Sequence, residues 1–303
     1  MLRFTKKTKK DSGRVCLHVS AEGTAIAVSK LNGANLELQH CEFFNASKLA
    51  DNPDSLKDFI TDNKLTGANC SLILSAHEYQ MLLTEAPQVA PEEMCDALWW
   101  RVKDLVAFDL DNAELDYLEL PEDSDKNQGT KLYAVVADKS KIAAKIAWAE
   151  SLDLIPVTVE IPETAILHLV SDLCSDIVGT SVLFLDAEQS LLMLMSETKM
   201  YLSRTLKYNY LHRMEALVLD LQRSMDYYES QMGKPPCRKV IVLPQQSDDT
   251  AIMQNLAENI GVAIETVDIN DLINADGALT IELQQHCLVA ISGALRLDQK
   301  VKK

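Results

Sequence analysis

In the first part of the chain, largely hydrophobic runs that favour strands are separated by polar residues that favour turns, which predicts three consecutive strands. Arg14–Val19 and Ala25–Leu31 are strand-like runs on either side of Ser20-Ala21-Glu22-Gly23-Thr24, whose residues favour turns. Leu36–Phe44 has the composition of a third strand and follows the turn pair Asn32-Gly33. The chain is therefore expected to open with an antiparallel meander.

Helical and strand-like segments then alternate as far as residue 174. Helices are predicted, in chain order, over Asp54–Asn63, Pro91–Phe108, Lys139–Leu152 and Pro162–Cys174. Strands are predicted over Asn69–Ser75, Asn112–Leu120, Lys131–Ala137 and Val157–Ile161. The charged stretch Pro121–Thr130 is expected to be a loop.

The same plan restarts near Thr180, which predicts a second lobe related to the first. Strands are expected over Ser181–Leu185, Leu191–Met195, Lys199–Thr205, Lys239–Leu243 and Val262–Val267. Helices are expected over His212–Ser230, Asp249–Ile260 and Leu283–Leu295. Alternating strands and helices favour a layered α/β protein.

Composition and charge narrow the class of protein. The chain has 303 residues, of which 47% are hydrophobic, so it is long enough to form two lobes with hydrophobic cores. Its net charge of −16 repels nucleic acid. Residues 1–13 are expected to be a flexible basic N-terminus and residues 298–303 a basic tail, both able to make weak contact with anionic lipid. No run of about 18 apolar residues predicts a membrane span, which favours the cytoplasm.

Metal and disulfide chemistry find no support in the spacing of cysteine and histidine. The seven cysteines and six histidines are scattered, with no CxxC pair and no histidines at metal-ligand spacing. The chain is therefore expected to have no metal site and to reside in a reducing compartment.

A tryptophan-containing segment, Ala97–Phe108 with Trp99-Trp100, precedes the strand with Leu115-Asp116-Tyr117. The segment Leu154–Glu160, Arg204 and the segment Leu221–Tyr228 follow it in the chain. In the order and spacing of these segments, the sequence resembles proteins of the actin-like (ribonuclease H-like) fold, and more narrowly the PilM family of type IV pilus assembly proteins. The resemblance covers most of the chain and implies a first lobe over 14–155, an inserted subdomain over about 69–152, and a second lobe over 156–297.

Actin-like ATPases hold phosphates in two hairpins of the type Asp-x-Gly, because glycine lets backbone amides approach the phosphate and aspartate organises the metal. In the first hairpin of this chain, His18 replaces the aspartate, Ser20 replaces the glycine, and Glu22 precedes Gly23. A carboxylate within about 4 Å of a phosphate charge costs about 4 kcal/mol at an effective dielectric constant near 20.

The other two nucleotide loops also depart from the family pattern. The second hairpin keeps Asp186 but continues with Ala187 and Glu188, and Pro244-Gln245 stands where two glycines are expected near the adenosine. Three altered loops predict a pseudo-ATPase without catalytic residues or a cofactor. ATP and magnesium are expected only if the chain is an active enzyme.

The resemblance implies a cytoplasmic protein at the inner face of the bacterial inner membrane. Such a protein binds the short cytoplasmic tail of an inner-membrane partner of the PilN type in a groove between the first lobe and its insertion. An assembly ATPase or a platform protein is a further candidate partner. Candidates for the docking surface are Trp99, Trp100 and Phe108. Two adjacent tryptophans lie about 100° apart on a helix, so both are buried only if the helix is covered on two sides.

Two other functions remain open from the sequence. The chain could be an active actin-like ATPase of pilus or secretion assembly, in which case it binds ATP measurably. It could also be an adaptor of type II secretion, like the soluble part of a GspL protein. Association with a short-tailed pilus membrane protein separates the scaffold from this adaptor.

Overall fold

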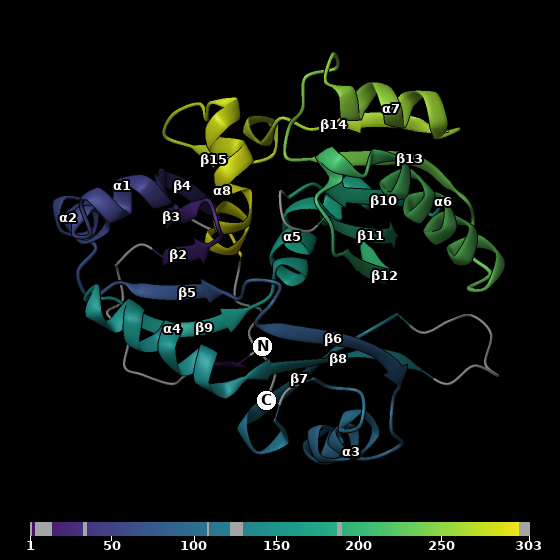
Figure 1. The fold of residues 1–303 in the computed structure, drawn as a ribbon, viewed down its shortest axis with the longest axis horizontal. Coiled ribbons are helices and arrows are strands. Elements are labelled where there is room, and N and C mark those ends of the chain that lie inside the picture. Colours follow the sequence, from purple (N-terminus) through teal and green to yellow (C-terminus); the bar gives the residue numbers. More distant parts are fainter. Residues whose placement is uncertain are drawn as a thin grey trace. The chain divides into compact units, whose positions relative to one another are not determined.

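The computed structural model (Figure 1) describes residues 2–3, 14–32, 35–107, 109–121, 130–186 and 190–296. The chain divides into two compact units. The first comprises Met1–Ala165, Asn274–Asp276 and Val289–Lys303, and the second comprises Ile166–Ile273 and Gly277–Leu288. Both are built from sheets and helices, as the alternating pattern predicted.

The main sheet of the first unit has seven strands in the order β1-β9-β5-β2-β3-β4-β15. The predicted meander is confirmed by the antiparallel strands β2 (Arg14–Val19), β3 (Gly23–Asn32) and β4 (Asn35–Asn45). The strands β5 (Asn69–Ile73) and β9 (Ile155–Glu160) extend the sheet in parallel. Two short strands, β1 (Leu2–Arg3) and β15 (Asn274–Ala275), close its two edges.

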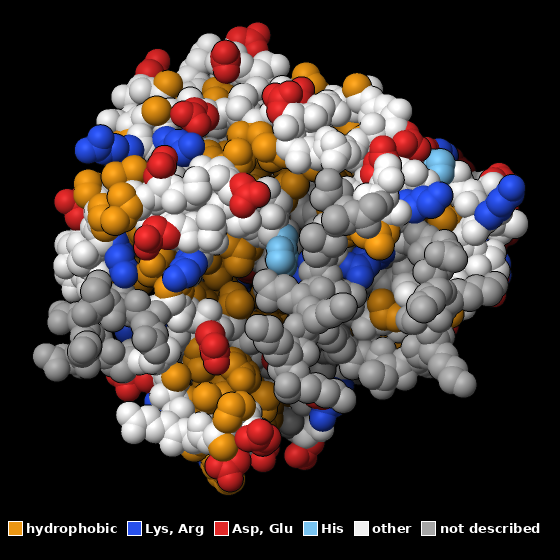
Figure 2. Space-filling model, turned by 180° about the vertical axis from the view of Figure 1, so that it is seen from behind, with side chains coloured by type: hydrophobic (Ala, Val, Ile, Leu, Met, Phe, Trp, Pro, Cys, Tyr) orange, Lys and Arg blue, Asp and Glu red, His pale blue; other side chains and the backbone are white. Residues whose placement is uncertain are grey.

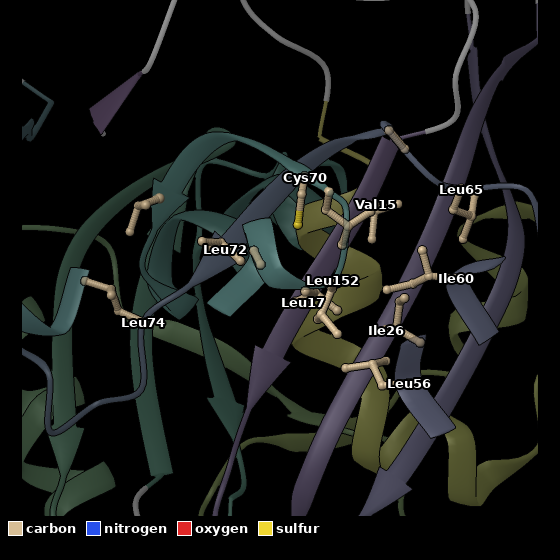
Figure 3. Close-up of a cluster of buried hydrophobic side chains, with 14 of the residues drawn as sticks. Val15, Leu17, Ile26, Leu56, Ile60, Leu65, Cys70, Leu72, Leu74 and Leu152 are labelled. Atoms are coloured by element: carbon tan, nitrogen blue, oxygen red, sulfur yellow. The ribbon is translucent and has the colours of Figure 1, made fainter. Parts of the chain in front are cut away.

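Helices cover the main sheet because apolar side chains stand on both of its faces. The helices α1 (Ala46–Asp51), α2 (Ser55–Asp62) and α4 (Lys139–Ser151) belong to the first unit. Figure 3 shows side chains of α2 and of the strands gathered in one buried cluster, which includes Val15, Leu17, Ile26, Leu56, Ile60 and Leu72. Burial of side chains of this size stabilises the fold by about 1.5–3 kcal/mol each.

The C-terminal end of α8 (Ile281–Ala294) packs against β2 and β5 of the main sheet in the first unit. A Cβ at Gly293 would lie 2.6 Å from the Cys16 sulfur and 2.9 Å from Cδ1 of Ile73, so only glycine allows this close approach. The Ser29 hydroxyl donates a hydrogen bond of 2.5 Å to the carbonyl of Ala294. The segment that follows α8 is thereby held beside the main sheet.

A small antiparallel sheet is inserted between β5 and β9. Its strands are β6 (Tyr79–Glu85), β7 (Ala113–Glu119) and β8 (Lys131–Asp138), in the order β6-β8-β7. Its helix α3 (Met94–Val102) packs with Met94, Leu98 and Val102 against one face of this sheet. We call the segment Tyr79–Asp138 the insertion.

The second unit repeats the plan of the first. Its sheet has the order β12-β11-β10-β13-β14, formed by β10 (Gly179–Phe184), β11 (Ser190–Ser196), β12 (Lys199–Leu206), β13 (Cys237–Leu243) and β14 (Ala263–Thr266). The meander is antiparallel, and β13 and β14 are parallel additions. The helices are α5 (Pro162–Val170), shared with the first unit, α6 (Met214–Ser230) and α7 (Ala251–Asn259).

Several boundaries differ from the sequence-based expectation. The helix predicted over Pro91–Phe108 is a 3-10 turn over Pro91–Glu93 followed by α3, which ends at Val102, and Phe108 lies outside the described residues. The strand β9 pairs with β5, so the first unit extends past residue 155. The strand β5 belongs to the main sheet, so the insertion starts after it.

The terminal segments are described only in part. Leu2 and Arg3 pair with β9, a contact that the sequence pattern did not predict, and residues 4–13 and 297–303 lie outside the described residues. Most of the predicted loop Pro121–Thr130 also lies outside them. Within the part of the chain that the structure describes, none of the helices combines the length and hydropathy that crossing a bilayer requires.

Candidate functional site

A cavity of about 130 Å³ lies within the first unit, between the insertion and the end of β9. It is formed by residues from the strands β7, β8 and β9, the helices α4 and α5, and the segments after β5 and α8. The lining residues are Leu74, Glu114, Asp116, Tyr117, Leu118, Val135, Ala137, Ile142, Val159, Glu160, Ile161, Thr164 and Arg296.

The two-residue period of the small sheet explains which side chains reach the cavity. On β8, Ala134 and Val136 belong to the core under α3, whereas Val135 and Ala137 line the cavity. On β7, Leu115 belongs to the α3 core, Glu114, Asp116 and Leu118 line the cavity, and Tyr117 contacts both. The sheet therefore separates a closed apolar core from an open apolar cavity.

A buried ion pair stands at the β9 side of the cavity. The side chain of Glu160 is 1% exposed and accepts hydrogen bonds from the Arg296 guanidinium and, at 3.3 Å, from the Thr164 hydroxyl. Burial raises the pKa of Glu160, although Arg296 and Thr164 act in the opposite direction. The guanidinium of Arg14 donates to the carbonyl of Arg296. Residues from both ends of the chain thus fix this wall of the cavity.

Acidic side chains also come from β7. Glu114 pairs with Lys139 at 3.4 Å, and Asp116 accepts a hydrogen bond of 2.8 Å from the amide of Tyr117. Among the lining residues there are three acids and one arginine, and the others are mainly aliphatic. Because Lys139 pairs with Glu114 and Arg296 pairs with Glu160, the aliphatic side chains dominate the lining, and the site suits an extended chain that carries aliphatic side chains.

Strand edges lie on two sides of the cavity. Among the described residues, β7 pairs on one side only, with β8, and the edge of β9 opposite β5 is covered by β1 at Thr158 and Val159. Backbone groups at an open edge can pair with an incoming extended peptide. The cavity therefore offers both pockets for side chains and main-chain pairing partners.

The hairpin that was compared with a phosphate loop is closed by its own hydrogen bonds. The amide of Ser20 donates to the carbonyl of Gly23 at 2.9 Å, and the amide of Gly23 donates to the carbonyl of Ser20 at 3.3 Å. Gly23 has a φ of 155°, and a Cβ there would lie 2.1 Å from the carbonyl oxygen of Phe44. Glycine is thus required for packing against β4, and the two amides are already engaged.

His18 is the next-to-last residue of β2 and lies two residues before Ser20, where the turn of this hairpin begins. Burial and the neighbouring ammonium of Lys145 lower the pKa of His18 to about 4. Its imidazole is therefore neutral near pH 7 and brings neither the charge nor the oxygen ligands with which an aspartate organises a hydrated magnesium ion. Glu22 is exposed in the turn itself.

The remaining two loops belong to the second unit. Asp186 is half-buried after β10, and Glu188 lies outside the described residues. After β13, the peptide bond between Leu243 and Pro244 is cis, and the carbonyl of Pro244 accepts from the side chain of Gln246 at 3.1 Å. Gln245 is half-buried and its carbonyl accepts from the side chain of Gln285 at 3.4 Å.

The two tryptophans of α3 have different environments. Trp99 packs against the core under α3, whereas Trp100 is 71% exposed. The ammonium of Lys103 lies over the Trp100 ring, 4.5 Å from its centre. Among the residues that the structure describes, the helix is therefore covered on the side of Trp99 and open on the side of Trp100. Figure 2 shows hydrophobic side chains on the lower part of the molecule, where Figure 1 places the insertion, with acidic side chains at their border. Neither tryptophan lines the cavity.

Sequence reasoning pointed to the strand with Asp116 and Tyr117 but did not predict the roles of Glu114, Glu160 and Arg296. The pairing of Glu160 with Arg296 joins positions 136 residues apart, which no local pattern reveals. Alternation along Ala113–Glu119 was the available signal, because it places Glu114, Asp116 and Leu118 on one face.

Solved structures with the same fold span nearly the whole chain. The PilM–PilN type IV pilus biogenesis complex matches with a TM-score of 0.76 and 16% identity, over 94% of this chain and 98% of that chain. A Bacteroides thetaiotaomicron protein with an actin-like ATPase fold matches with a TM-score of 0.53 and 12% identity, over 87% and 93%. The cytoplasmic domain of EpsL, from the type II secretion system of Vibrio cholerae, matches with a TM-score of 0.51 and 12% identity, over 94% and 98%.

These similarities show that the chain has the actin-like fold, which confirms the fold class expected from the order of its segments. Comparisons of the sequence with protein-family models and with curated proteins found no match.

Proposed function

We propose that this protein is a scaffold of type IV pilus assembly that binds the cytoplasmic tail of an inner-membrane protein of the PilN type. The cavity between β7 and β9 is the observation that carries the proposal, because it combines aliphatic walls, acids and strand edges. Segments on the cytoplasmic side of membrane proteins are rich in Lys and Arg, which suits a chain with a net charge of −16. The similarity in fold to PilM, whose structure was solved as a complex with PilN, supports the same assignment.

We further propose that the scaffold is a pseudo-ATPase. The engaged amides of the first hairpin and the neutral His18 support this proposal, as does Pro244 in the third loop. On this account the protein works at the cytoplasmic face of the inner membrane without a cofactor. Within the PilM family the sequence most resembles MshI, and we therefore assign the scaffold to an MSHA-like pilus. The fold similarity to the EpsL domain has a lower TM-score than that to PilM, so an adaptor of type II secretion is the weaker candidate.

Tail binding is tested with a labelled synthetic peptide of the cytoplasmic tail of the PilN-type protein from the same genome, by fluorescence anisotropy. Leu118 and Leu83 form a matched pair, because they lie opposite Tyr133 on the two edges of the small sheet, and only Leu118 lines the cavity. Leu118→Trp fills the cavity and is expected to weaken tail binding by about tenfold or more, which corresponds to about 1.4 kcal/mol. Leu83→Trp is expected to leave the affinity unchanged. Equal effects of the two variants would remove the cavity from the account.

The pseudo-ATPase proposal is tested by titration of the protein with ATP and magnesium, followed by calorimetry and by the melting temperature. We expect no heat of binding and no rise in melting temperature at millimolar nucleotide, because a ligand at 100 times its Kd would stabilise the fold by about 2.7 kcal/mol. Micromolar binding would contradict the proposal and favour the active ATPase.

A further inference from the structure

The edge of β9 that faces away from β5 is occupied by a segment of the same chain. Leu2 pairs with Val159 and Arg3 with Thr158, in antiparallel register. Val159 is also a lining residue of the cavity, so the first residue of β1 pairs with a strand position that borders the cavity. The chain's own N-terminal residues thus hold main-chain groups beside the proposed tail site.

We propose that β9 is a strand-acceptor site, that β1 is its built-in occupant, and that the partner tail binds by displacing β1. This inference rests on the proposed function, because it concerns the same cavity. The ligand class is an extended peptide in which an aliphatic residue is followed by a cationic one, paired antiparallel to β9.

The chemistry of the occupant supports this ligand class. The segment begins Met1-Leu2-Arg3-Phe4, in which a cation stands between apolar residues. The adjoining cavity offers aliphatic side chains together with three carboxylates and one guanidinium. A partner tail that replaces β1 meets the same backbone edge, and it is expected to carry the same residue classes as the segment that it displaces.

The backbone of β9 explains why its edge needs an occupant. On its inner side β9 pairs with β5 from Ile155 to Glu160, and on its outer side the described pairing is limited to Thr158 and Val159. An uncovered edge exposes unpaired amides and carbonyls to other chains. Pro156 removes one donor at the start of the strand, which leaves the end near the cavity as the usable part of the edge.

The expected strength of this self-contact is modest. Two residue pairs contribute few hydrogen bonds, each worth about 0.5–1.5 kcal/mol net. The ten residues 4–13 tether β1 to β2, and a short tether gives an effective concentration in the millimolar range. A closed form populated at about 50–90% raises the apparent Kd of a competing tail by about two- to tenfold.

Substitution of Leu2 in the full-length chain tests this inference. Leu2→Pro removes a backbone donor and restricts the backbone of β1, whereas Thr8→Pro places the same change outside β1. Leu2→Pro is expected to tighten binding of the labelled tail peptide by about two- to tenfold. It is also expected to speed hydrogen exchange at residues 157–160 of the free protein. Thr8→Pro is expected to change neither quantity.

A peptide of residues 1–10 added to the Leu2→Pro protein provides the second arm. It is expected to restore protection at residues 157–160 and to compete with the labelled tail, whereas a peptide of reversed sequence is not. Unchanged tail affinity and unchanged exchange in Leu2→Pro would overturn the inference while leaving tail binding intact. Failure of the tail to bind any of these proteins would instead overturn the proposed function, and the exchange at residues 157–160 would still decide whether β1 holds this edge.

Discussion

The two units share one sheet plan and differ in what is inserted into it. The order β9-β5-β2-β3-β4 in the first unit corresponds strand for strand to β14-β13-β10-β11-β12 in the second. Between β13 and β14 the second unit has the single helix α7, whereas between β5 and β9 the first unit has the insertion and α4. The cavity lies against this insertion.

This difference indicates where the function of the protein resides. The features common to both units are the hairpins that hold phosphates in actin-like ATPases. In this chain the first hairpin is closed on itself, and the loop after β13 contains proline. The feature that is not duplicated brings acids, aliphatic side chains and the strand edges of β7 and β9 together. The surface between the insertion and β9 of the first unit, and not the duplicated hairpins, is therefore expected to bind the partner.

The largest expected effect comes from truncation of core leucines in the two units. Leu98 in the insertion and Leu221 in the second unit are both fully buried. Replacement of either by alanine is expected to lower the free energy of unfolding by about 2–5 kcal/mol, because it leaves a cavity. Denaturant unfolding measures this loss for each variant.

The two variants are expected to differ in tail binding, measured well below their melting temperatures. Leu98→Ala loosens the packing of α3 on the small sheet and is expected to weaken tail affinity, whereas Leu221→Ala is expected to leave it unchanged. The opposite order would place the tail site in the second unit and break the comparison.

The pH dependence of stability is the next largest effect and comes from His18 in the first unit. Because the pKa of His18 is about 4 in the folded protein and about 6.5 in the unfolded chain, the unfolded state takes up the proton first as pH falls. Stability is therefore complete above pH 6.5 and is lost toward pH 4, by about 3 kcal/mol.

Denaturant unfolding of the protein and of His18→Gln at pH 7 and pH 4 isolates this contribution. Burial raises the pKa values of Glu160 and Glu163, which act in the opposite direction and are present in both proteins. The difference between the two proteins is expected to shrink at pH 4. If the two proteins differed in unfolding free energy by the same amount at both pH values, His18 would be protonated at pH 4 in the folded state as it is in the unfolded state.

The smallest expected effect distinguishes the two tryptophans of α3. Trp99→Ala is expected to destabilise the protein by more than 1 kcal/mol, because its ring packs against the core under α3. Trp100→Ala is expected to change stability by less than about 0.5 kcal/mol, because its ring is exposed. Thermal unfolding measures both changes. A large loss of stability in Trp100→Ala would contradict the one-sided packing of α3.

Sequence patterns predicted most elements of both units, because the helices repeat apolar residues at a spacing of three and four and strands such as β10 and β11 are largely apolar runs buried on both faces. They failed for β6, where Met81, Leu82 and Leu83 are consecutive apolar residues without alternation. They also failed for β1 and β15, which are two residues long and carry no period. The cavity forms where β6, β8 and β7 pair and where Glu160 contacts Arg296. Because these contacts join residues far apart in the sequence, local patterns do not predict them.

Hydrogen exchange of the full-length protein, with and without the partner tail peptide, tests the central claim most directly. Amides that become paired or covered on binding exchange more slowly. We predict that the tail protects β7, that residues 157–160 of β9 stay protected as the tail replaces β1, that β10–β14 do not change, and that ATP and magnesium do not protect residues 18–23. Protection confined to the second unit, or protection of residues 18–23 by nucleotide, would contradict the account.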